Sequence, residues 1–186
     1  MIGYAFTGSF CTVSHSLVQL RGLLSLGYDV LPIMSERVYS TDTRFGKAAE
    51  LIELVEDITS HKIVHTVEGA EPLGAMTPLE YMIIAPCTGN TLAKLASGIT
   101  DTSVTMAAKA HLRCDRPLLI ALASNDSMSQ NLGNIARLLT RKSVYFLPLS
   151  QDDPSGKPHS LVANFSLLQA AFAAMQDGKQ LRPLFV

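Results

Sequence analysis

The spacing of apolar residues along the chain predicts strands and helices in alternation. Residues 1–6 form a short apolar and aromatic run that ends at the turn residues "TGSF", as a buried strand does. From residue 12 to residue 26 the apolar positions recur at steps of three and four, which is the period of an amphipathic helix. Gly27 follows this run and is expected to cap the carboxyl end of the helix.

The same patterns continue to the end of the chain. They predict further strands at residues 28–35, 62–67, 80–85, 116–123 and 143–147, and further helices at residues 43–58, 88–96, 102–112, 132–139 and 161–175. Such alternation is typical of an α/β fold in which helices cover both faces of a parallel sheet. The stretch 151–158, "QDDPSGKP", is expected to be a surface flap, since the chain that follows it is too short to fold alone.

Small polar residues gather where four of the predicted strands end. The clusters are "TGSF" after the first strand, "MSER" after the second, "PCTGNT" after residue 85 and "ASNDS" after residue 122. Ligands of parallel sheets bind beyond the carboxyl ends of the strands. We therefore expect the four clusters to form one shared site.

Composition narrows the class of protein. With 186 residues, 47% of them hydrophobic and 17% charged, the chain suits one well-buried domain. The net charge of −1 and the absence of a basic run give no field that would attract nucleic acid or anionic membrane. No apolar run reaches the roughly 18 residues of a membrane helix. The stretch "MIGYAFTGSFC" has no basic n-region, so it is not expected to be a secretory signal. Three cysteines without paired spacing favour reduced thiols in a cytoplasm and predict no metal site.

The first polar cluster predicts a cradle for a phosphate group. Gly8 lets a ligand approach the backbone amides, Ser9 and Thr12 add hydroxyl groups, and the following helix presents unpaired N–H groups. The cluster lacks both the G-x-G-x-x-G fingerprint and the GK[ST] of a P-loop. The alternative interpretation is an ordinary turn between a strand and a helix with a serine cap.

The cluster "PCTGNT" is rich in neutral hydrogen-bonding groups and has no charge. Pro86 ends strand pairing, Gly89 allows close approach, and Thr88, Asn90 and Thr91 supply donors and caps. Such a loop suits a phosphate and the edge of a heteroaromatic ring. An ordinary helix N-terminus is the alternative, but the convergence of four clusters favours a nucleotide-like ligand.

No catalytic acid or base can be assigned from the sequence. The five histidines are His15, His61, His65, His111 and His159. None of them has the sequence context of a catalytic triad. His111 is expected near the carboxyl end of a helix, where a cation is favoured. Cys87 is expected to be a packed residue, and Asp101 is expected to cap the next helix or to hold a loop on a neighbouring protomer.

Several longer motifs resemble a known family. They are "GSFCT" (8–12), "TDTRFG" (41–46), "AEPLG" (70–74), "PCTGNTLAKLA" (86–96), "ITDTSVTMAAKAHLR" (99–113) and "QDDPSGKPHSLVA" (151–163). With these motifs the chain resembles the homo-oligomeric flavin-containing cysteine decarboxylase superfamily, whose members bind FMN, and within it the dipicolinate synthase B subunits. The resemblance implies one flavoprotein-like domain over residues 1–186. Its fold would be α/β, a three-layer Rossmann-like (flavodoxin-like) parallel sheet with helices on both faces.

The resemblance also implies which residues hold the cofactor. The family pattern places the FMN phosphate at Ser9 and Ser35 and the flavin ring near "PCTGNT". The predicted cofactor-binding residues are Gly8, Ser9, Phe10, Ser35, Pro86, Thr88, Gly89, Asn90, Thr91, Ser124 and Asn125. No metal ligand is expected, and the catalytic residues stay unassigned.

What the resemblance implies for activity is the formation of dipicolinic acid from a dihydrodipicolinate-type precursor, with release of two hydrogens. This chain would be one component of an oxidoreductase and would act with an A subunit carrying NAD(P), in the mother-cell cytoplasm of a spore-forming bacterium. A homo-oligomer, a trimer or a multiple of it, is expected. Asn90, Ser124 and Asn125 are candidates to bind the dicarboxylate, and Arg44 and Lys109 are candidate charges or simply solvated groups.

Two departures from the relatives bear on the reaction. Met106 stands where prenyl-transferring relatives carry an arginine, which argues against a second phosphorylated substrate. The late strand ends in "ALASNDSMSQN" instead of the P-x-M-N motif of the decarboxylases, which argues against decarboxylation. Two alternatives stay open: a non-catalytic scaffold with a vestigial flavin pocket, and a phosphopantothenoylcysteine decarboxylase-like enzyme.

Overall fold

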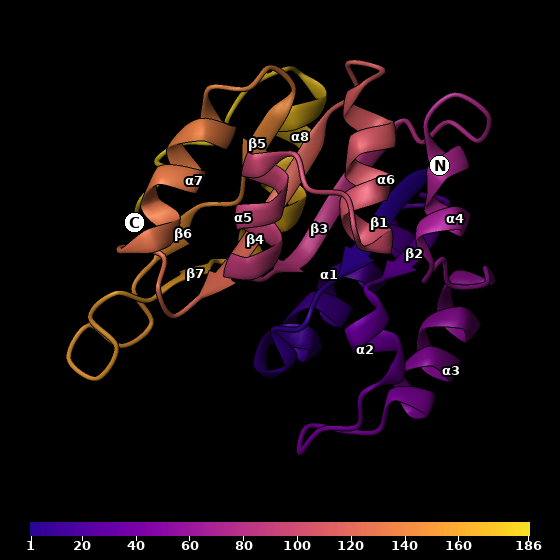
Figure 1. The fold of residues 1–186 in the computed structure, drawn as a ribbon, viewed down its shortest axis with the longest axis horizontal. Coiled ribbons are helices and arrows are strands. Elements are labelled where there is room, and N and C mark those ends of the chain that lie inside the picture. The colour runs from indigo at the N-terminus through magenta and orange to yellow at the C-terminus, as the bar shows by residue number, and fades with distance from the viewer.

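A computed structural model describes residues 1–186, and its centre is one seven-stranded sheet (Figure 1). The strands are β1 (Ile2–Phe6), β2 (Val30–Met34), β3 (Tyr81–Cys87), β4 (Leu118–Ser124), β5 (Val144–Phe146), β6 (Leu149–Ser150) and β7 (Leu161–Ala163). The first five pair in parallel in the order β2-β1-β3-β4-β5, which is the order of the flavodoxin-like, Rossmann type of fold. β7 pairs antiparallel with β4 and β6, so the sheet is mixed and not purely parallel.

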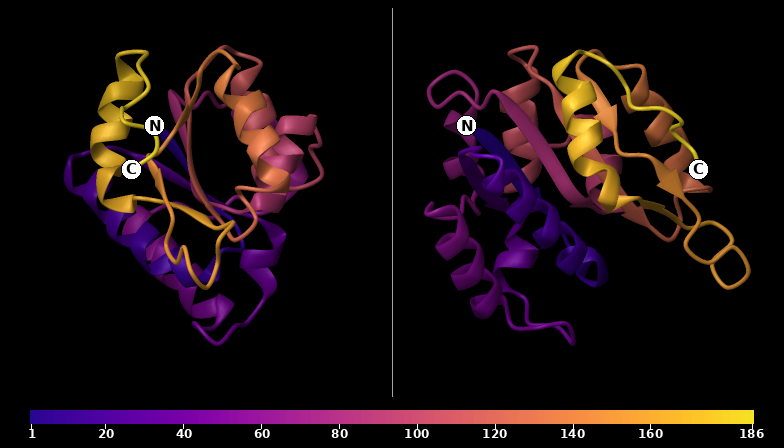
Figure 2. Two further views of the ribbon diagram at one scale, coloured as in Figure 1. Left: turned by 90° about the vertical axis from the view of Figure 1, so that its left-hand side faces the viewer. Right: turned by 180° about the vertical axis from the view of Figure 1, so that it is seen from behind.

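Helices cover both faces of this sheet, so the predicted three layers are confirmed. Figure 2 shows α1 (Val13–Ser25) and α8 (Leu168–Gln176) on one face and α5 (Gly89–Ser97), α6 (Ser103–Leu112) and α7 (Gln130–Leu139) on the other. The remaining helices are α2 (Glu36–Ser40), α3 (Ala48–Thr59) and α4 (Val67–Ala70), with short 3₁₀ turns η1 (Phe10–Thr12), η2 (Glu71–Leu73) and η3 (Phe165–Leu167). None of these helices combines the length and the apolar character needed to cross a membrane.

The central strands form the core because helices cover them on both sides. Every residue of β1 is buried, as are the last six residues of β3 and the first six of β4. Strands of this kind read as continuous apolar runs, which is why their positions are visible in the sequence. β2 lies at the edge of the sheet, where Pro32 costs no interior ladder bond.

Two elements predicted from the local sequence pattern are wrong, because the pairing of each segment with neighbouring strands determines its structure. Residues 62–67 contribute a single parallel bridge, Ile33 to Val64, before α4 begins. The helix predicted at 161–175 is divided: Leu161–Ala163 pairs as β7, and the Asn164 side chain then accepts a hydrogen bond from the Ser166 amide to start η3. The short helix α2 is absent from the prediction.

The helix predicted at 43–58 begins later than expected. A tight turn joins Thr43 to Gly46 through two backbone hydrogen bonds, and α3 starts at Ala48. The Asp42 carboxylate accepts a hydrogen bond from the Ala48 amide at 2.9 Å. It therefore satisfies the first amide of α3, although it lies six residues earlier in the chain. The turn therefore projects beyond the strand ends instead of continuing the helix.

Candidate functional site

A cavity of about 780 Å³ lies at the carboxyl ends of β1, β3 and β4. Its walls are the loops that follow these three strands, the 43–46 turn and the flap. The residues that line it are Gly8, Ser9, Phe10, Cys11, Thr12, His15, Arg44, Phe45, Thr88, Gly89, Asn90, Ala123, Ser124, Asn125, Asp126, Asp152, Lys157, Ser160 and Val162. Three of the four predicted polar clusters thus share one cavity.

The buried Thr7 joins the first two of these loops. Its hydroxyl donates to the Pro86 carbonyl at 2.8 Å and accepts from the Thr88 amide at 2.8 Å. The Thr7 amide donates to the same Pro86 carbonyl at 3.1 Å. Because one side chain satisfies groups on both loops, the turn at Gly8 and the start of α5 hold a fixed separation.

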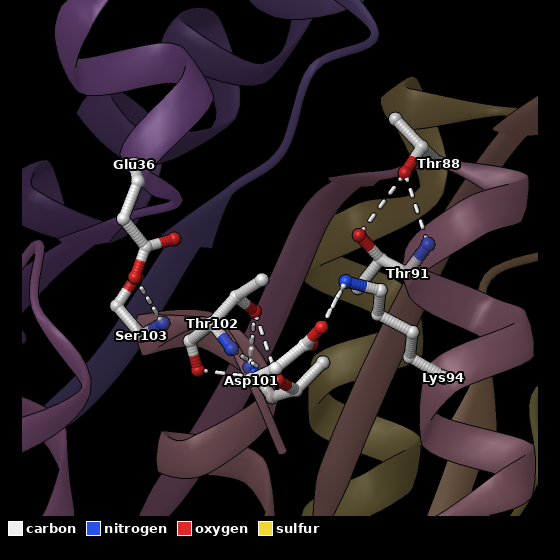
Figure 3. Close-up of polar contacts among 8 residues, drawn as sticks. Glu36, Thr88, Thr91, Lys94, Asp101, Thr102 and Ser103 are labelled. Carbon is white, nitrogen blue, oxygen red and sulfur yellow. Dashed lines mark hydrogen bonds and ion pairs between the residues drawn. The ribbon is translucent and has the colours of Figure 1, made fainter. Parts of the chain in front are cut away.

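Both loops present unpaired backbone amides to the cavity. The amides of Gly8 and Phe10 precede the first helical hydrogen bond, and those of Gly89 and Asn90 open α5, so none has a backbone acceptor. The Thr88 hydroxyl caps α5 by accepting from the Thr91 amide at 3.1 Å, as the sticks in Figure 3 show. Neutral donors at two helix starts favour an anionic group or the polar edge of a ring.

The third wall is a fixed polar cluster at the end of β4. Ser124 Oγ donates to Asp126 Oδ1 at 2.5 Å, and Asn131 Nδ2 donates to the same oxygen at 2.8 Å. The hydrogen bond from Ser124, and after it the one from Asn131, hold the pKa of the Asp126 carboxyl below its usual value. The Asp126 carboxylate is therefore ionised and held in place beside the N-terminus of α5.

An apolar recess of about 440 Å³ adjoins the cavity between α1, α2 and α3. It shares Phe10, Cys11 and Phe45 with the cavity, and Leu51 and Leu54 of α3 line its far side. Its wall offers few of the donors that the strand-end loops supply. The polar cavity is therefore the candidate site.

Eight of the eleven predicted cofactor-binding residues line the polar cavity: Gly8, Ser9, Phe10, Thr88, Gly89, Asn90, Ser124 and Asn125. The other three are buried and do not line it. Ser35 caps α2 by accepting from the Val38 amide at 3.4 Å, the Pro86 carbonyl serves Thr7, and Thr91 bonds to Thr88. The structure therefore brings together the first, third and fourth polar clusters and leaves Ser35 outside.

The end of β2 is instead tied to the start of α6. The Glu36 carboxylate accepts from the Ser103 amide at 2.9 Å (Figure 3). Ser103 Oγ donates to the Met34 carbonyl at 2.6 Å. Thr102 caps α6, with its hydroxyl accepting from the Thr105 amide, so the prediction that Asp101 caps this helix is wrong. Asp101 forms an ion pair with Lys94 at 2.8 Å.

His111 also departs from its prediction. It is fully buried, its Nε2 donates to the Pro117 carbonyl at 2.8 Å, and burial lowers its pKa to about 4. The ring is therefore neutral, so the expected cation is absent. Cys87 is packed as predicted, and burial raises the pKa of its thiol.

Three residues at the site have no site role in the sequence-based prediction. Thr7 joins the loops, Asp126 fixes the third wall, and Lys157 reaches the cavity from the flap. Thr7 and Asp126 each stand next to a predicted site residue, and Lys157 follows a turn-rich stretch. Both belong to the quoted clusters "TGSF" and "ASNDS", so assigning a role to every polar residue of those clusters would have found them. Of the two candidate charges, Arg44 lines the cavity and Lys109 does not.

Comparison with known proteins gives matches over the whole chain. The family model described as Flavoprotein matches residues 1–178. The chain is 41% identical over 185 residues to the dipicolinate synthase B subunit of Bacillus subtilis (strain 168), a match that covers 100% of this chain and 92% of that protein.

Solved structures show the same likeness. The crystal structure of the dipicolinate synthase B subunit from Bacillus halodurans C matches with a TM-score of 0.91 and 41% identity, over 100% of this chain and 95% of that one. The FMN-dependent cysteine decarboxylase SpaF matches with a TM-score of 0.67 and 20% identity, over 95% of each chain. At 20% identity the second match shows the fold alone.

Proposed function

Because this chain belongs to the flavoprotein family, and within it to the dipicolinate synthase B subunits, we propose that it binds FMN and takes part in forming dipicolinic acid. Its substrate would be a dihydrodipicolinate-type precursor, and its partner the A subunit of the synthase, which would carry NAD(P). The assembly would be an oxidoreductase that acts on a CH–CH bond during sporulation, in the mother-cell cytoplasm. We further propose that the chain works as a homo-oligomer, a trimer or a multiple of it.

The donors in the cavity fit a flavin mononucleotide. The amides of Gly8 and Phe10 and the hydroxyl of Ser9 would hold the phosphate, which needs several donors and no bulky side chain. Thr88, Gly89 and Asn90 would meet the polar edge of the ring, which carries carbonyl and amide groups. A fold neighbour, SpaF, is described as FMN-dependent, which agrees with this fit.

Aromatisation of a dihydropyridine removes one hydride and one proton. Bound flavin supplies a two-electron acceptor for the hydride, and a nicotinamide on the A partner offers a second one. The protein's own task is to bind and orient the precursor in the cavity. Asn90, Ser124 and Asn125 line that cavity and are proposed to donate to the substrate.

One observation carries the proposal: two amide-rich loops, joined through Thr7, open into the same cavity. Cofactor uptake tests it directly. Purified chain that is mixed with FMN and then freed of unbound cofactor by gel filtration should stay yellow, with absorbance near roughly 450 nm that elutes with the protein.

The variant Asn90→Asp sharpens this titration. It places a negative charge among the proposed ligand donors, and at the second position of α5 it also suits the helix dipole, so folding is preserved. We expect FMN affinity to fall by about tenfold or more. Asn164→Asp is the matched control, since that residue caps η3 and does not line the cavity.

Reconstitution tests the share of this chain in catalysis. The A partner, precursor and nicotinamide cofactor would be assayed for dipicolinate alone, with this chain, and with this chain plus FMN. Equal rates in all three assays would refute a catalytic role. A rate that needs the chain but not FMN would instead favour the scaffold with a vestigial flavin pocket, and carbon dioxide release would favour the decarboxylase alternative.

A further inference from the structure

Two cations reach the cavity from separate segments of the chain. Arg44 comes from the 43–46 turn and Lys157 from the flap, and both line the cavity at the strand ends. We propose that Arg44 and Lys157 each bind one carboxylate of the substrate and so select dicarboxylates over monocarboxylates. This inference rests on the proposed function, because it names the groups that recognise the proposed substrate class.

Arg44 sits on a tightly bonded turn. The Thr43 amide donates to the Gly46 carbonyl at 3.0 Å, and the Gly46 amide donates back at 3.2 Å. The guanidinium lies 4.9 Å from the centre of the Phe45 ring, a distance at which the ring attracts a cation. No carboxylate lies within 4.0 Å of the guanidinium, so its five donors are available to a ligand.

Lys157 is held by the flap itself. Its Nζ lies 2.9 Å from the Asp152 carboxylate, which also accepts from Ser160 Oγ at 2.5 Å. Ser160 Oγ in turn reaches the Ser124 carbonyl at 3.4 Å, which connects the flap to the end of β4. An ammonium group has three donors, so Lys157 can keep its bond to Asp152 and still donate to a ligand carboxylate.

Two carboxylates, Asp126 and Asp152, also line the cavity, and neither pairs with Arg44. Asp126 accepts from Ser124 and Asn131 beside the N-terminus of α5, and Asp152 is paired with Lys157. The Arg44 guanidinium is therefore a cation left without a compensating carboxylate. A ligand carboxylate beside the turn would supply the partner that the guanidinium lacks.

The placement of the two cations suits a ligand with two acidic ends. Figures 1 and 2 show the α2–α3 connection and the flap as separate projections at the end of the molecule where β1, β3 and β4 end. In this proposal a ring with two carboxylates engages both segments, whereas a monocarboxylate engages one. Specificity then arises from the difference between two charge-assisted contacts and one.

Calorimetric titration of the full-length chain tests this, with pyridine-2,6-dicarboxylate and pyridine-2-carboxylate as the two probes. The chain should bind the dicarboxylate about tenfold or more tightly than the monocarboxylate. Arg44→Gln and Lys157→Gln should each reduce that preference to about twofold or threefold, while Arg44→Lys and Lys157→Arg should retain most of it. Lys109→Gln removes an exposed lysine that does not line the cavity, and should leave the preference unchanged.

FMN affinity, measured on the same variants, separates this inference from the proposed function. If Arg44→Gln weakens FMN binding and leaves the preference intact, the guanidinium serves the cofactor and the inference is refuted. If the chain takes up FMN but binds both acids equally, the inference fails and the flavin function survives. A preference that depends on both cations in a chain that takes up no FMN would support the inference and refute the cofactor assignment.

Discussion

At the scale of single residues, the Thr7 hydroxyl links loops that lie far apart in the chain. Thr7 and Pro86 are separated by 79 positions, yet one side chain bonds to both Pro86 and Thr88. The hydroxyl is buried, so water cannot replace it if it is removed. The geometry of both amide-rich loops therefore depends on a single oxygen atom.

Replacement of Thr7 by valine should destabilise the fold by about 1–3 kcal/mol, because it leaves the half-buried Thr88 amide without its acceptor. Urea unfolding measures the loss. Thr59→Val is the control, since the buried Thr59 hydroxyl donates to the Val55 carbonyl and accepts from the His61 amide at 3.4 Å, and so bonds only within its own stretch of chain. The idea fails if both substitutions cost the same.

The neutral, buried His111 should make stability depend on pH. Its pKa is lowered to about 4 from the ordinary value of 6.5, so between these values the unfolded chain binds a proton that the folded chain does not. The contribution to stability is complete above about pH 6.5 and is lost as the pH falls toward 4, by about 3 kcal/mol at most. Urea unfolding at several pH values should show a shallower decline for His111→Gln than for the unaltered chain, and parallel curves would contradict this.

Sequence reasoning found site residues that stand directly after strands. Gly8, Ser9 and Asn90 are recognisable because small or polar residues after an apolar run mark the ligand-binding edge of a parallel sheet. Thr7 was missed because its importance lies in partners about 80 positions away, which no local pattern contains. The neutrality of His111 likewise follows from burial, which its position near a helix end does not reveal.

At the scale of elements, the start of α5 is packed against the loop that follows β4. A methyl group on Gly89 would stand 2.5 Å from Ser124 Oγ, 2.6 Å from Asn131 Nδ2 and 3.0 Å from Asp126 Oδ1. These distances are shorter than a carbon atom tolerates, and the three neighbours are themselves bonded to one another. The absence of a side chain at residue 89 thus allows α5 and the third wall of the cavity to meet.

The substitution Gly89→Ala should therefore destabilise the protein by about 1–3 kcal/mol, although alanine is the better helix former. Gly133→Ala on α7 is the matched control, since its added methyl group meets no atom within 4 Å. That control should stabilise the protein by about 0.5–1 kcal/mol. Thermal unfolding of both variants decides the matter, and two changes of the same sign would count against the packing argument.

Elements were predictable where burial or periodicity alone determines them. β1 and β4 are apolar throughout, and α1 carries its apolar residues at helical spacing. The residues of β7 could not be recognised, because a three-residue strand between a flap and a helix has no period of its own. Its identity comes from pairing with β4 and β6, which is a property of the assembled sheet.

At the scale of the whole molecule, the sheet order gathers the strand-end loops around one cavity, with the flap and the 43–46 turn as its outer walls. A ligand held by so many segments should stabilise the fold as a whole. FMN at about 100 times its dissociation constant adds about 2.7 kcal/mol, which raises Tm by roughly 5–10 °C for a chain of this size.

Riboflavin tests the origin of that stabilisation, because it has the ring but lacks the phosphate. At the same concentration it should raise Tm much less, since the amides of Gly8 and Phe10 would have no anion to bind. Differential scanning calorimetry with both compounds provides the comparison. Equal shifts would show that the amides at the first strand end do not hold a phosphate.

The two chain ends, marked in Figure 1, differ in their relation to the cavity. Met1 precedes β1, and its amine lies 3.4 Å from the Glu80 carboxylate. It therefore lies at the amino ends of the strands, away from the loops proposed to bind ligands. The Val186 amide bonds to the Leu149 carbonyl, and the C-terminal residue shares a recess with Pro154 of the flap. Attachment to a sensor surface through the amino terminus therefore leaves the mouth of the cavity facing solution, whereas attachment through the carboxyl terminus crowds the flap.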